Sequence, residues 1–291
     1  MAKQPLAEVF GFPIDNHSGQ AIRQRTKKLC PYNNKVPNCT KDKANAPLGV
    51  CSILESEGTA ITCPVRFRED WLIAEHAATF FFSPETAWTS LTEVRLNDSD
   101  GKSAGNIDIV LVAYDDHGKI TDFGSLEIQA VYISGNVRRP FEAYMKDAEH
   151  NSNFDWSGEK NYPRPDYLSS SRKRLIPQLL FKGGILHAWK KKSAVALTEG
   201  FFETLPKLEE VPEEDAEMAW MLYDLVRDEK TNTFKLTLQK TVYTQFEASI
   251  AKISQPNPGE IKDFIGVLQD KLDSQLDNPP DAPTLQDIMN Q

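Results

Sequence analysis

The stretch GNIDIVLVAYDDHGKITDFGSLEIQAVYISG, residues 105–135, carries the clearest secondary-structure pattern in this sequence. Its apolar run over 107–113 predicts a strand that is buried on both faces at its centre. The segment DDHGK, residues 115–119, predicts a tight turn, because Gly118 can adopt a positive backbone angle. A second β-rich run follows over 124–133. The stretch therefore predicts an antiparallel hairpin.

Three polar residues of this hairpin are candidates for chemistry. Glu127 and Gln129 are two apart, so they share one face of their strand, and the hairpin brings Asp108 alongside. Two converging carboxylates form a hard-oxygen site suited to Mg²⁺, and the carbonyl of Ile128 offers a further ligand. A Mg²⁺ ion held there can bind a phosphate and activate water. The alternative is that Asp108 is a surface residue at a strand end and that Glu127 and Gln129 form the polar side of an edge strand, since E-x-Q often arises by accident.

All four cysteines lie in one polar region, residues 30–64, which begins CPYNNKVPNCTKDKANAPLGVC. They are Cys30, Cys39, Cys51 and Cys63, with eight, eleven and eleven residues between them. Four thiolates complete a tetrahedral site for iron or zinc, and softness alone does not decide between these metals. Such a site would order a loop that lacks apolar residues. Two disulfides, disfavoured in the cytoplasm, or four unrelated thiols are the alternatives.

The rest of the chain predicts an α/β or α+β fold with a mixed sheet. Residues 1–19 are expected to be a loosely ordered arm. Helices are expected over 20–29, 68–82, 83–96 (Ser83 as N-cap, Pro84 first), 138–150, 213–229 and 259–273. Further strands are expected within 193–202 and 233–250, and 276–284 is expected to be a flexible tail.

The composition is that of an ordinary globular protein, with 40% hydrophobic and 26% charged residues in 291. No secretory signal or membrane span is expected, so the predicted compartment is the cytoplasm. The net charge is −9, yet basic residues cluster. These clusters, at 23–28, 138–139, 172–174 and 190–192, indicate either a polyanionic partner or solvated helix faces.

The order Asp, hairpin turn, E-x-[KQ] is the core of the PD-(D/E)xK nuclease fold. Together with the cysteine region and LEIQAVYISGNVRRPFEAYM, residues 126–145, the sequence closely resembles the NotI-type restriction endonucleases. The resemblance is strong from roughly Arg25 to Met145 and more diffuse elsewhere. It implies a central mixed β-sheet flanked by helices, with an N-terminal Cys₄ region.

The resemblance also implies a type II restriction endonuclease. Such enzymes are homodimers that use Mg²⁺ to cut GC-rich palindromic double-stranded DNA, leaving 5′-phosphate and 3′-hydroxyl ends. A cognate methyltransferase, which is not a physical partner, is expected in the host. Asp108 and Glu127 match the metal-binding carboxylates, Gln129 replaces the more common lysine and would orient water, and Glu93 matches an upstream acid on the preceding helix. The four cysteines match the ligands of a single iron.

This chain is compact for the family, so the family's target sequences do not carry over. The expected domains are 1–66 (Cys₄ and DNA recognition), 67–275 (nuclease) and 276–291 (tail). Candidate DNA contacts are the basic and amide residues Lys27, Lys28, Asn33, Asn34, Lys35, Asn38, Lys41, Lys43, Arg138 and Arg139. The rival hypotheses are a metal-finger protein that binds DNA without cutting it and, less consistent with these residues, an iron redox carrier.

Overall fold

The computed structural model of the protein describes residues 3–43, 46–56, 58–277 and 289. Its central feature is the predicted hairpin, formed by β8 (Ser103–Tyr114) and β9 (Ile120–Gln129). The two strands pair antiparallel, with Ile109 opposite Leu126. Gly118 in the connecting turn has a φ of 75°, a conformation that glycine adopts without strain. The hairpin prediction is confirmed.

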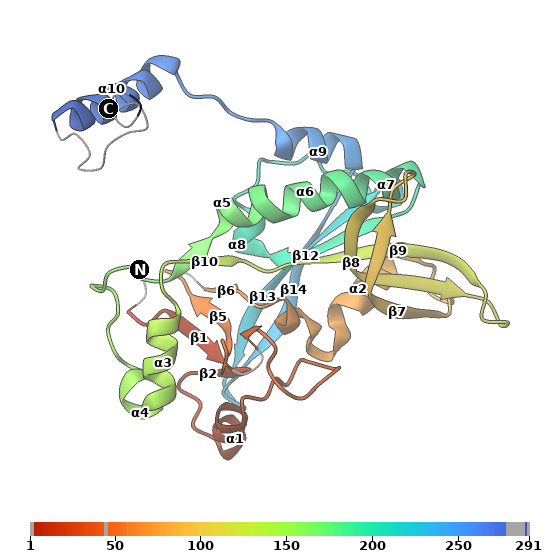
Figure 1. Ribbon diagram of the computed structural model, residues 1–291. Coiled ribbons are helices and arrows are strands. Elements are labelled where there is room, and N and C mark those ends of the chain that lie inside the picture. Colours follow the sequence, from red (N-terminus) through yellow and green to blue (C-terminus); the bar gives the residue numbers. More distant parts are fainter. Residues whose placement is uncertain (1–2, 44–45, 57, 278–288, 290–291) are drawn as a thin grey trace. The chain divides into compact units, whose positions relative to one another are not determined.

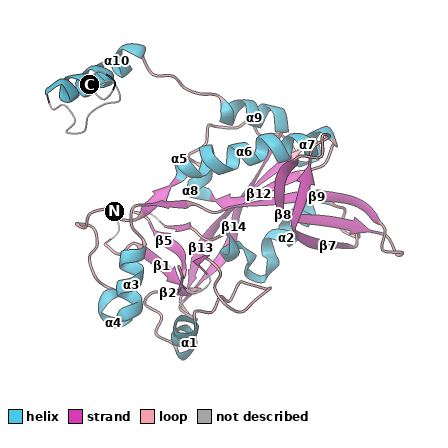
Figure 2. Cartoon of the chain, in the orientation of Figure 1, coloured by secondary structure: helices cyan, strands magenta, loops and turns pink. Residues whose placement is uncertain are grey.

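The hairpin belongs to a six-stranded sheet with the order β14-β13-β12-β9-β8-β7 (Figure 2). The other strands are β7 (Trp88–Asn97), β12 (Ser193–Thr198), β13 (Met218–Asp228) and β14 (Thr233–Thr244). β12 runs parallel to β9 and β13, while the remaining pairs are antiparallel. The predicted fold class, a central mixed sheet flanked by helices, is therefore confirmed.

Helices cover both faces of this sheet (Figure 1). One face packs on α2 (Leu72–Phe81), inside the predicted helix 68–82, and buries Leu126 and Ile128 of β9. The helices of the opposite face are α5 (Tyr167–Ser170), η2 (Ser171–Leu175), α6 (Ile176–Gln178), η3 (Leu179–Gly183), α7 (Gly184–Ala188), α8 (Glu199–Phe202) and α9 (Phe246–Ser254). Because side chains alternate along a strand, Glu127 and Gln129 belong to this second face.

The expectation that residues 1–19 form a loose arm is wrong. β1 (Leu6–Val9) and β2 (Phe12–Pro13) join a second sheet of order β2-β1-β5-β6, because Leu6 and Val9 are fully buried and supply its core. The other elements of this part are α1 (Gly19–Lys27), β3 (Asp42–Lys43), β4 (Ala46–Pro47), β5 (Val50–Leu54), β6 (Thr59–Ile61), β10 (Tyr132–Ser134), α3 (Arg138–Lys146), α4 (Ala148–Asn151) and β11 (Arg164–Asp166).

Two predicted helices are strands. Residues 83–96 form a turn at Ser83–Thr86 followed by β7, in which half-buried and exposed side chains alternate along an edge strand. The helix expected over 213–229 is a single 3₁₀ turn, η4 (Glu213–Asp215), and then β13, whose first six residues are all buried. A strand at the centre of a sheet is apolar on both faces, so it lacks the alternation that identifies a strand from sequence.

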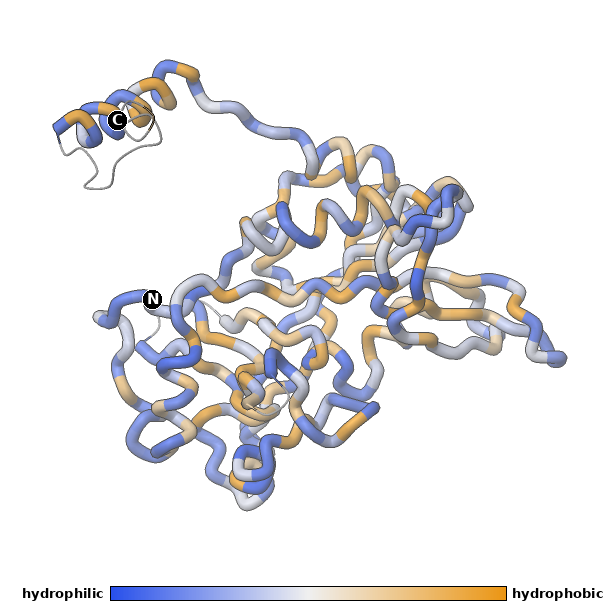
Figure 3. Tube along the Cα trace, in the orientation of Figure 1, coloured by the Kyte–Doolittle hydropathy of each residue, from blue (hydrophilic) through white to orange (hydrophobic). Residues whose placement is uncertain are grey.

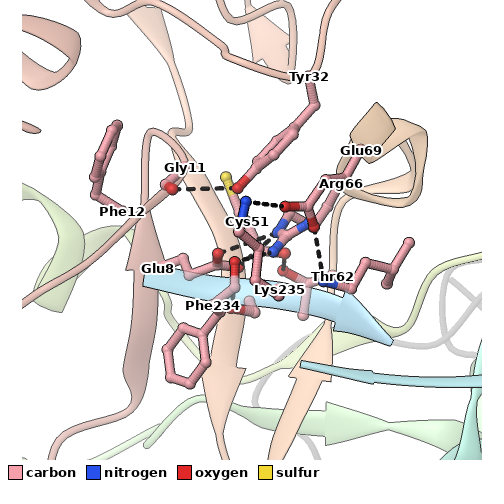
Figure 4. A network of polar contacts seen from close by, with 12 residues as sticks. Glu8, Gly11, Phe12, Tyr32, Cys51, Thr62, Arg66, Glu69, Phe234 and Lys235 are labelled. Atoms are coloured by element: carbon pink, nitrogen blue, oxygen red, sulfur yellow. Dashed lines mark hydrogen bonds and ion pairs between the residues drawn. The ribbon is translucent and has the colours of Figure 1, made fainter. Parts of the chain in front are cut away.

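A buried ion-pair network around Arg66 joins the two sheets (Figure 4). Arg66 lies in the kinked 3₁₀-helical segment η1 (Pro64–Trp71) and is fully buried. Its guanidinium donates to Glu8 of β1 (3.0 Å), to Glu69 (2.8 Å) and to the Phe234 carbonyl of β14 (3.0 Å). The ring of Tyr32, in the cysteine region, lies 4.3 Å from the guanidinium.

The chain divides into two compact units, Met1–Ile253 and Ser254–Gln291. The second contains α10 (Ile261–Asp277), which confirms the helix expected over 259–273. Hydrophobic and hydrophilic residues are interspersed along α10 (Figure 3), and large apolar side chains such as Phe264 and Leu276 are exposed. The predicted tail 276–284 lies almost entirely outside the described residues.

Replacing Arg66 tests the network. In Arg66→Met the carboxylate of Glu8, which is 0% exposed, loses its cationic partner inside the protein. We expect the free energy of unfolding to fall by about 3–5 kcal/mol, measured by urea denaturation. Lys235→Met is the control, because Lys235 reaches Glu69 from a half-exposed position (3.4 Å) and should cost less than about 1 kcal/mol. Equal losses in the two variants would show that the network does not anchor the fold.

Candidate active site and cysteine cluster

The structure brings Asp108, Glu127 and Gln129 together at the hairpin. The Asp108 Oδ2 atom accepts a hydrogen bond from the backbone N–H of Ile128 (2.8 Å), so this carboxylate lies between the other two positions. Glu127 and Gln129 are 6% and 2% exposed, and Asp108 is partly exposed. The Gln129 amide donates to the Ala130 carbonyl (2.8 Å). The partly exposed carboxylate of Asp108 therefore lies beside the buried side chains of Glu127 and Gln129.

Glu127 is the electrostatically unusual member. Burial, together with the charge of Asp108, raises the pKa of its carboxyl to about 7, although Lys182 acts in the opposite direction. Its Oε1 atom is buried and has no hydrogen-bond partner in the described structure. An unsatisfied buried carboxylate oxygen is costly, and a divalent cation is the kind of ligand that would satisfy it. The donor set therefore fits Mg²⁺.

Lys182 contacts Glu127 from the helix that covers this face of the sheet. It lies in η3, a π-helical turn of the helix that covers the sheet, and is 3% exposed. Its ammonium donates to Glu127 Oε2 (2.6 Å) and to the Asn106 carbonyl on β8 (2.8 Å). The pair is enclosed on both sides, with 4% and 7% side-chain exposure. Sequence reasoning did not single out Lys182.

Glu93 is the predicted site residue whose setting differs from expectation. It lies on the edge strand β7, not on a helix, and has a positive φ of 57°. Its neighbours Thr92 and Val94 pair with Ile109 and Ile107, so Glu93 stands across from Asp108 in the sheet. Its half-exposed carboxylate forms an ion pair with Arg68 at 3.9 Å.

The four cysteines gather from two short pairings. Cys30 and Cys39 flank a bridge between Leu29 and Asn38, while Cys51 in β5 and Cys63 after β6 are brought together by the β5–β6 pairing. Three of them, Cys30, Cys39 and Cys63, line one cavity of about 710 Å³. All four are free thiols.

The environment of these thiols is suited to a soft metal. Burial raises the pKa of Cys30 to about 11, while backbone N–H groups of Tyr32 and Asn33 favour its thiolate and the nearby sulfurs of Cys63 and Cys39 oppose it. Burial also raises the pKa of Cys51, as do Glu8, Cys63 and Cys30. Crowded thiols that receive N–H donors are a ligand set for iron or zinc. Among the described residues, however, no group of three or more His, Cys, Asp or Glu is already arranged to hold a metal ion.

Comparison with known proteins decides the family. The family model described as restriction endonuclease NotI matches residues 8–236. The chain belongs to the NotI restriction endonuclease family. Membership implies a type II restriction endonuclease, a site-specific nuclease that acts on double-stranded DNA. No curated protein matches the sequence. No helix within the described ranges is long and apolar enough to cross a membrane.

The NotI family match includes all the predicted DNA contacts. The exposed ones are Lys27, Lys28, Asn34, Lys35, Asn38, Lys43 and Arg139. Asn33 is partly buried and its side-chain oxygen accepts from the Lys35 N–H (3.1 Å). Arg138 pairs with Asp42, and Arg139 with Glu159 (2.7 Å).

Lys41 differs from the other predicted contacts. Its ammonium donates to the Val50 carbonyl (2.7 Å) and to both oxygens of Thr62 (3.0 and 3.2 Å). All three N–H donors of the ammonium are therefore used inside the protein. Lys41 connects the loop after Cys39 to β5, and a DNA contact through Lys41 stays a prediction.

The raised pKa of Glu127 predicts a pH effect on the stability of this NotI-family protein without added divalent cation. The pKa of about 7 in the folded state lies above the ordinary 4.5, so the folded protein binds the proton of Glu127 more tightly than the unfolded chain does. The contribution of this proton to the free energy of unfolding is fully present below pH 4.5 and is lost as pH rises through about 7. The loss amounts to about 3 kcal/mol. Urea unfolding between pH 5 and 8 should show wild type losing stability relative to Glu127→Gln. Asp122→Asn, half-exposed on the same strand, is the control. A constant difference between wild type and Glu127→Gln would contradict the buried-carboxyl interpretation.

Proposed function

We propose that this chain is a Mg²⁺-dependent type II restriction endonuclease that cuts GC-rich palindromic DNA in the cytoplasm. The products would carry 5′-phosphate and 3′-hydroxyl ends. The observation that carries this proposal is the convergence of Asp108, Glu127 and Gln129 on the hairpin, with one oxygen of Glu127 buried and unpartnered. A non-cleaving DNA-binding protein has no need of such a costly group.

The proposed roles follow from the setting of each side chain. Asp108 and Glu127 would hold Mg²⁺, which when bound supplies positive charge at the scissile phosphate and makes a water molecule more acidic. Gln129 is uncharged, so its amide would orient the attacking water by hydrogen bonding. Glu93, whose neighbours on β7 pair with the residues on either side of Asp108, is proposed as an accessory acid.

A homodimer is proposed because the described part of one chain offers one such site, whereas a palindrome presents two equivalent phosphates, one on each strand. The exposed lysines and asparagines of the cysteine region, with Arg138 and Arg139, are proposed to contact phosphates and base edges. A cognate methyltransferase would protect the host's own sites without binding this protein.

We further propose that Cys30, Cys39, Cys51 and Cys63 hold one structural iron, or zinc in its place. The support is that the sulfurs lie close enough to raise one another's pKa, and that backbone N–H groups donate to Cys30. Four protein ligands leave no open position, so this metal would shape the recognition loop without entering the chemistry. It would also draw the sulfurs around one centre.

Asp108→Asn should abolish cleavage while preserving DNA binding, because it removes a ligand charge at a partly exposed position. We expect a loss of at least about 10³-fold in the rate of plasmid cutting with Mg²⁺, and unchanged retention in a gel-shift assay. Asp122→Asn should cut like wild type. Cleavage by Asp108→Asn within about threefold of wild type would refute this assignment.

The same variant tests the homodimer. Co-expressed wild-type and Asp108→Asn chains carrying different tags give mixed dimers with one active site. Mixed dimers should nick supercoiled plasmid to open circles, whereas wild type linearises it. If no species with both tags can be purified, the homodimer proposal is wrong.

The cysteine site predicts metal in the purified protein. Elemental analysis should find about one iron or zinc per chain, and Cys51→Ser should lose it together with DNA affinity, because the loop depends on the metal for its shape. Mg²⁺ should not rescue this variant, since it prefers oxygen ligands. Thr40→Ala, beside Cys39 in the same cavity, should keep the metal. Fully active wild type without any transition metal would contradict the Cys₄ proposal.

A further inference from the structure

The most informative feature that the proposed function does not use is the burial of Lys182. A lysine ammonium taken out of water costs several kcal/mol unless it is well paired. Here the lysine side chain is 4% exposed, and its ammonium makes two hydrogen bonds, to Glu127 and to the Asn106 carbonyl. Apolar side chains of similar volume in place of both Lys182 and Glu127 would often leave stability unchanged or raise it. A role in stability alone therefore does not account for Lys182.

The backbone near this side chain has unusual features on both the helix and β8. η3 is a π-helical turn, a wide turn that often occurs at functional sites. The lysine stem passes over Gly105 of β8, where an added Cβ would lie 3.6 Å from its Cδ atom, and Gly105 has a φ of 116°. Gly183, which follows Lys182 in the chain, lets Phe246 of α9 approach, because a Cβ on Gly183 would lie 2.7 Å from the Phe246 ring. Gly183 thus lets the turn that carries Lys182 pack closely against α9.

The charge of the site shows what this lysine can do. Asp108 and Glu127 repel a phosphodiester, and Gln129 carries no charge to offset them. The Lys182 ammonium has three N–H donors, of which Glu127 and Asn106 engage two. Among the described contacts the third donor has no acceptor, and the unpartnered Oε1 of Glu127 belongs to the same ion pair. A phosphate oxygen forms strong charge-assisted hydrogen bonds with such a donor.

We propose that Lys182 is a catalytic residue that binds a non-bridging oxygen of the scissile phosphodiester. This inference rests on the proposed nuclease function. In the hydrolysis, the oxygen of water forms a bond to phosphorus and the P–O3′ bond breaks. The proton of water passes to solvent, and the departing 3′ oxygen takes up a proton to become the 3′-hydroxyl. Lys182 remains protonated throughout and offsets the charge that accumulates on the non-bridging oxygens.

The rate test compares Lys182→Met, which keeps the stem and loses the charge, with Lys182→Arg, which keeps the charge. Single-turnover cleavage at saturating protein and Mg²⁺ should fall about 10²–10³-fold in Lys182→Met, with partial recovery in Lys182→Arg. Lys191→Met is the matched control: Lys191 pairs with Asp122 on the same strand as Glu127, but is 28% exposed. It should cut within threefold of wild type.

A binding test separates a phosphate contact from a structural role. The probe is a duplex that contains the chain's own cleavage site, mapped by sequencing the ends of digested plasmid, with either phosphate or an uncharged methylphosphonate at the scissile linkage. Affinities are measured with Ca²⁺ in place of Mg²⁺. The methylphosphonate should weaken binding by wild type roughly tenfold more than binding by Lys182→Met. If Lys182→Met does not fold, Lys182→Gln and Lys182→Arg are compared in the same way.

The outcomes are distinct. If wild type cuts DNA and Lys182→Met cuts within threefold of it, the lysine proposal is wrong and the nuclease function stands. An equal effect of methylphosphonate on both proteins would also overturn the proposal and leave Lys182 as the structural partner of Glu127. If wild type binds DNA but never cuts it with Mg²⁺, the proposed function fails and the role of Lys182 fails with it.

Discussion

The guanidinium of Arg66 is the constraint on which the arrangement of the first unit depends. Its donors are directed at β1, at its own segment η1 and at β14, while Tyr32 covers its face (Figure 4). Because a guanidinium is planar and its donors are fixed in direction, these partners can occupy only one arrangement. Replacing such a network with apolar residues can leave stability unchanged, so its value lies in positioning.

The network also explains how a polar loop comes to have a defined place. Tyr32 lies two residues after Cys30, and its hydroxyl donates to the Gly11 carbonyl between β1 and β2 (3.2 Å). Burial raises the pKa of this hydroxyl well above its ordinary value, as does the charge of Glu8, so it remains a donor. The cysteine cluster is therefore positioned by contacts with the second sheet as well as by any metal. A metal would then fix the geometry within the cysteine loop, while Arg66 and Tyr32 fix the position of that loop against the second sheet.

The parts of the fold that sequence could predict are those specified by neighbouring residues. The hairpin of β8 and β9 combines two apolar runs with a turn, and that pattern was sufficient. β7 was misread because Ser83 and Pro84 form a plausible helix start that in fact caps a turn, and β13 because buried strands and buried helices look alike. The convergence of Asp108 with Glu127 followed from the hairpin. Arg66 and Lys182 could not be found, because their partners lie 58 and 55 residues away in sequence.

Charge balance links the lysine, the metal and the substrate. With both carboxylates ionised, Asp108, Glu127 and Lys182 leave one net negative charge, and a phosphodiester that enters adds a second. One divalent cation neutralises both, whereas a monovalent cation cannot. Because Glu127 and Lys182 are enclosed, uncompensated charge beside them is more costly than in water, so metal and phosphate should each favour binding of the other. In the absence of both, the raised pKa of Glu127, near 7, offers the alternative route to neutrality, by taking up a proton. The enclosure that makes Glu127 costly in the free protein is thus what couples DNA binding to metal binding in the proposed mechanism.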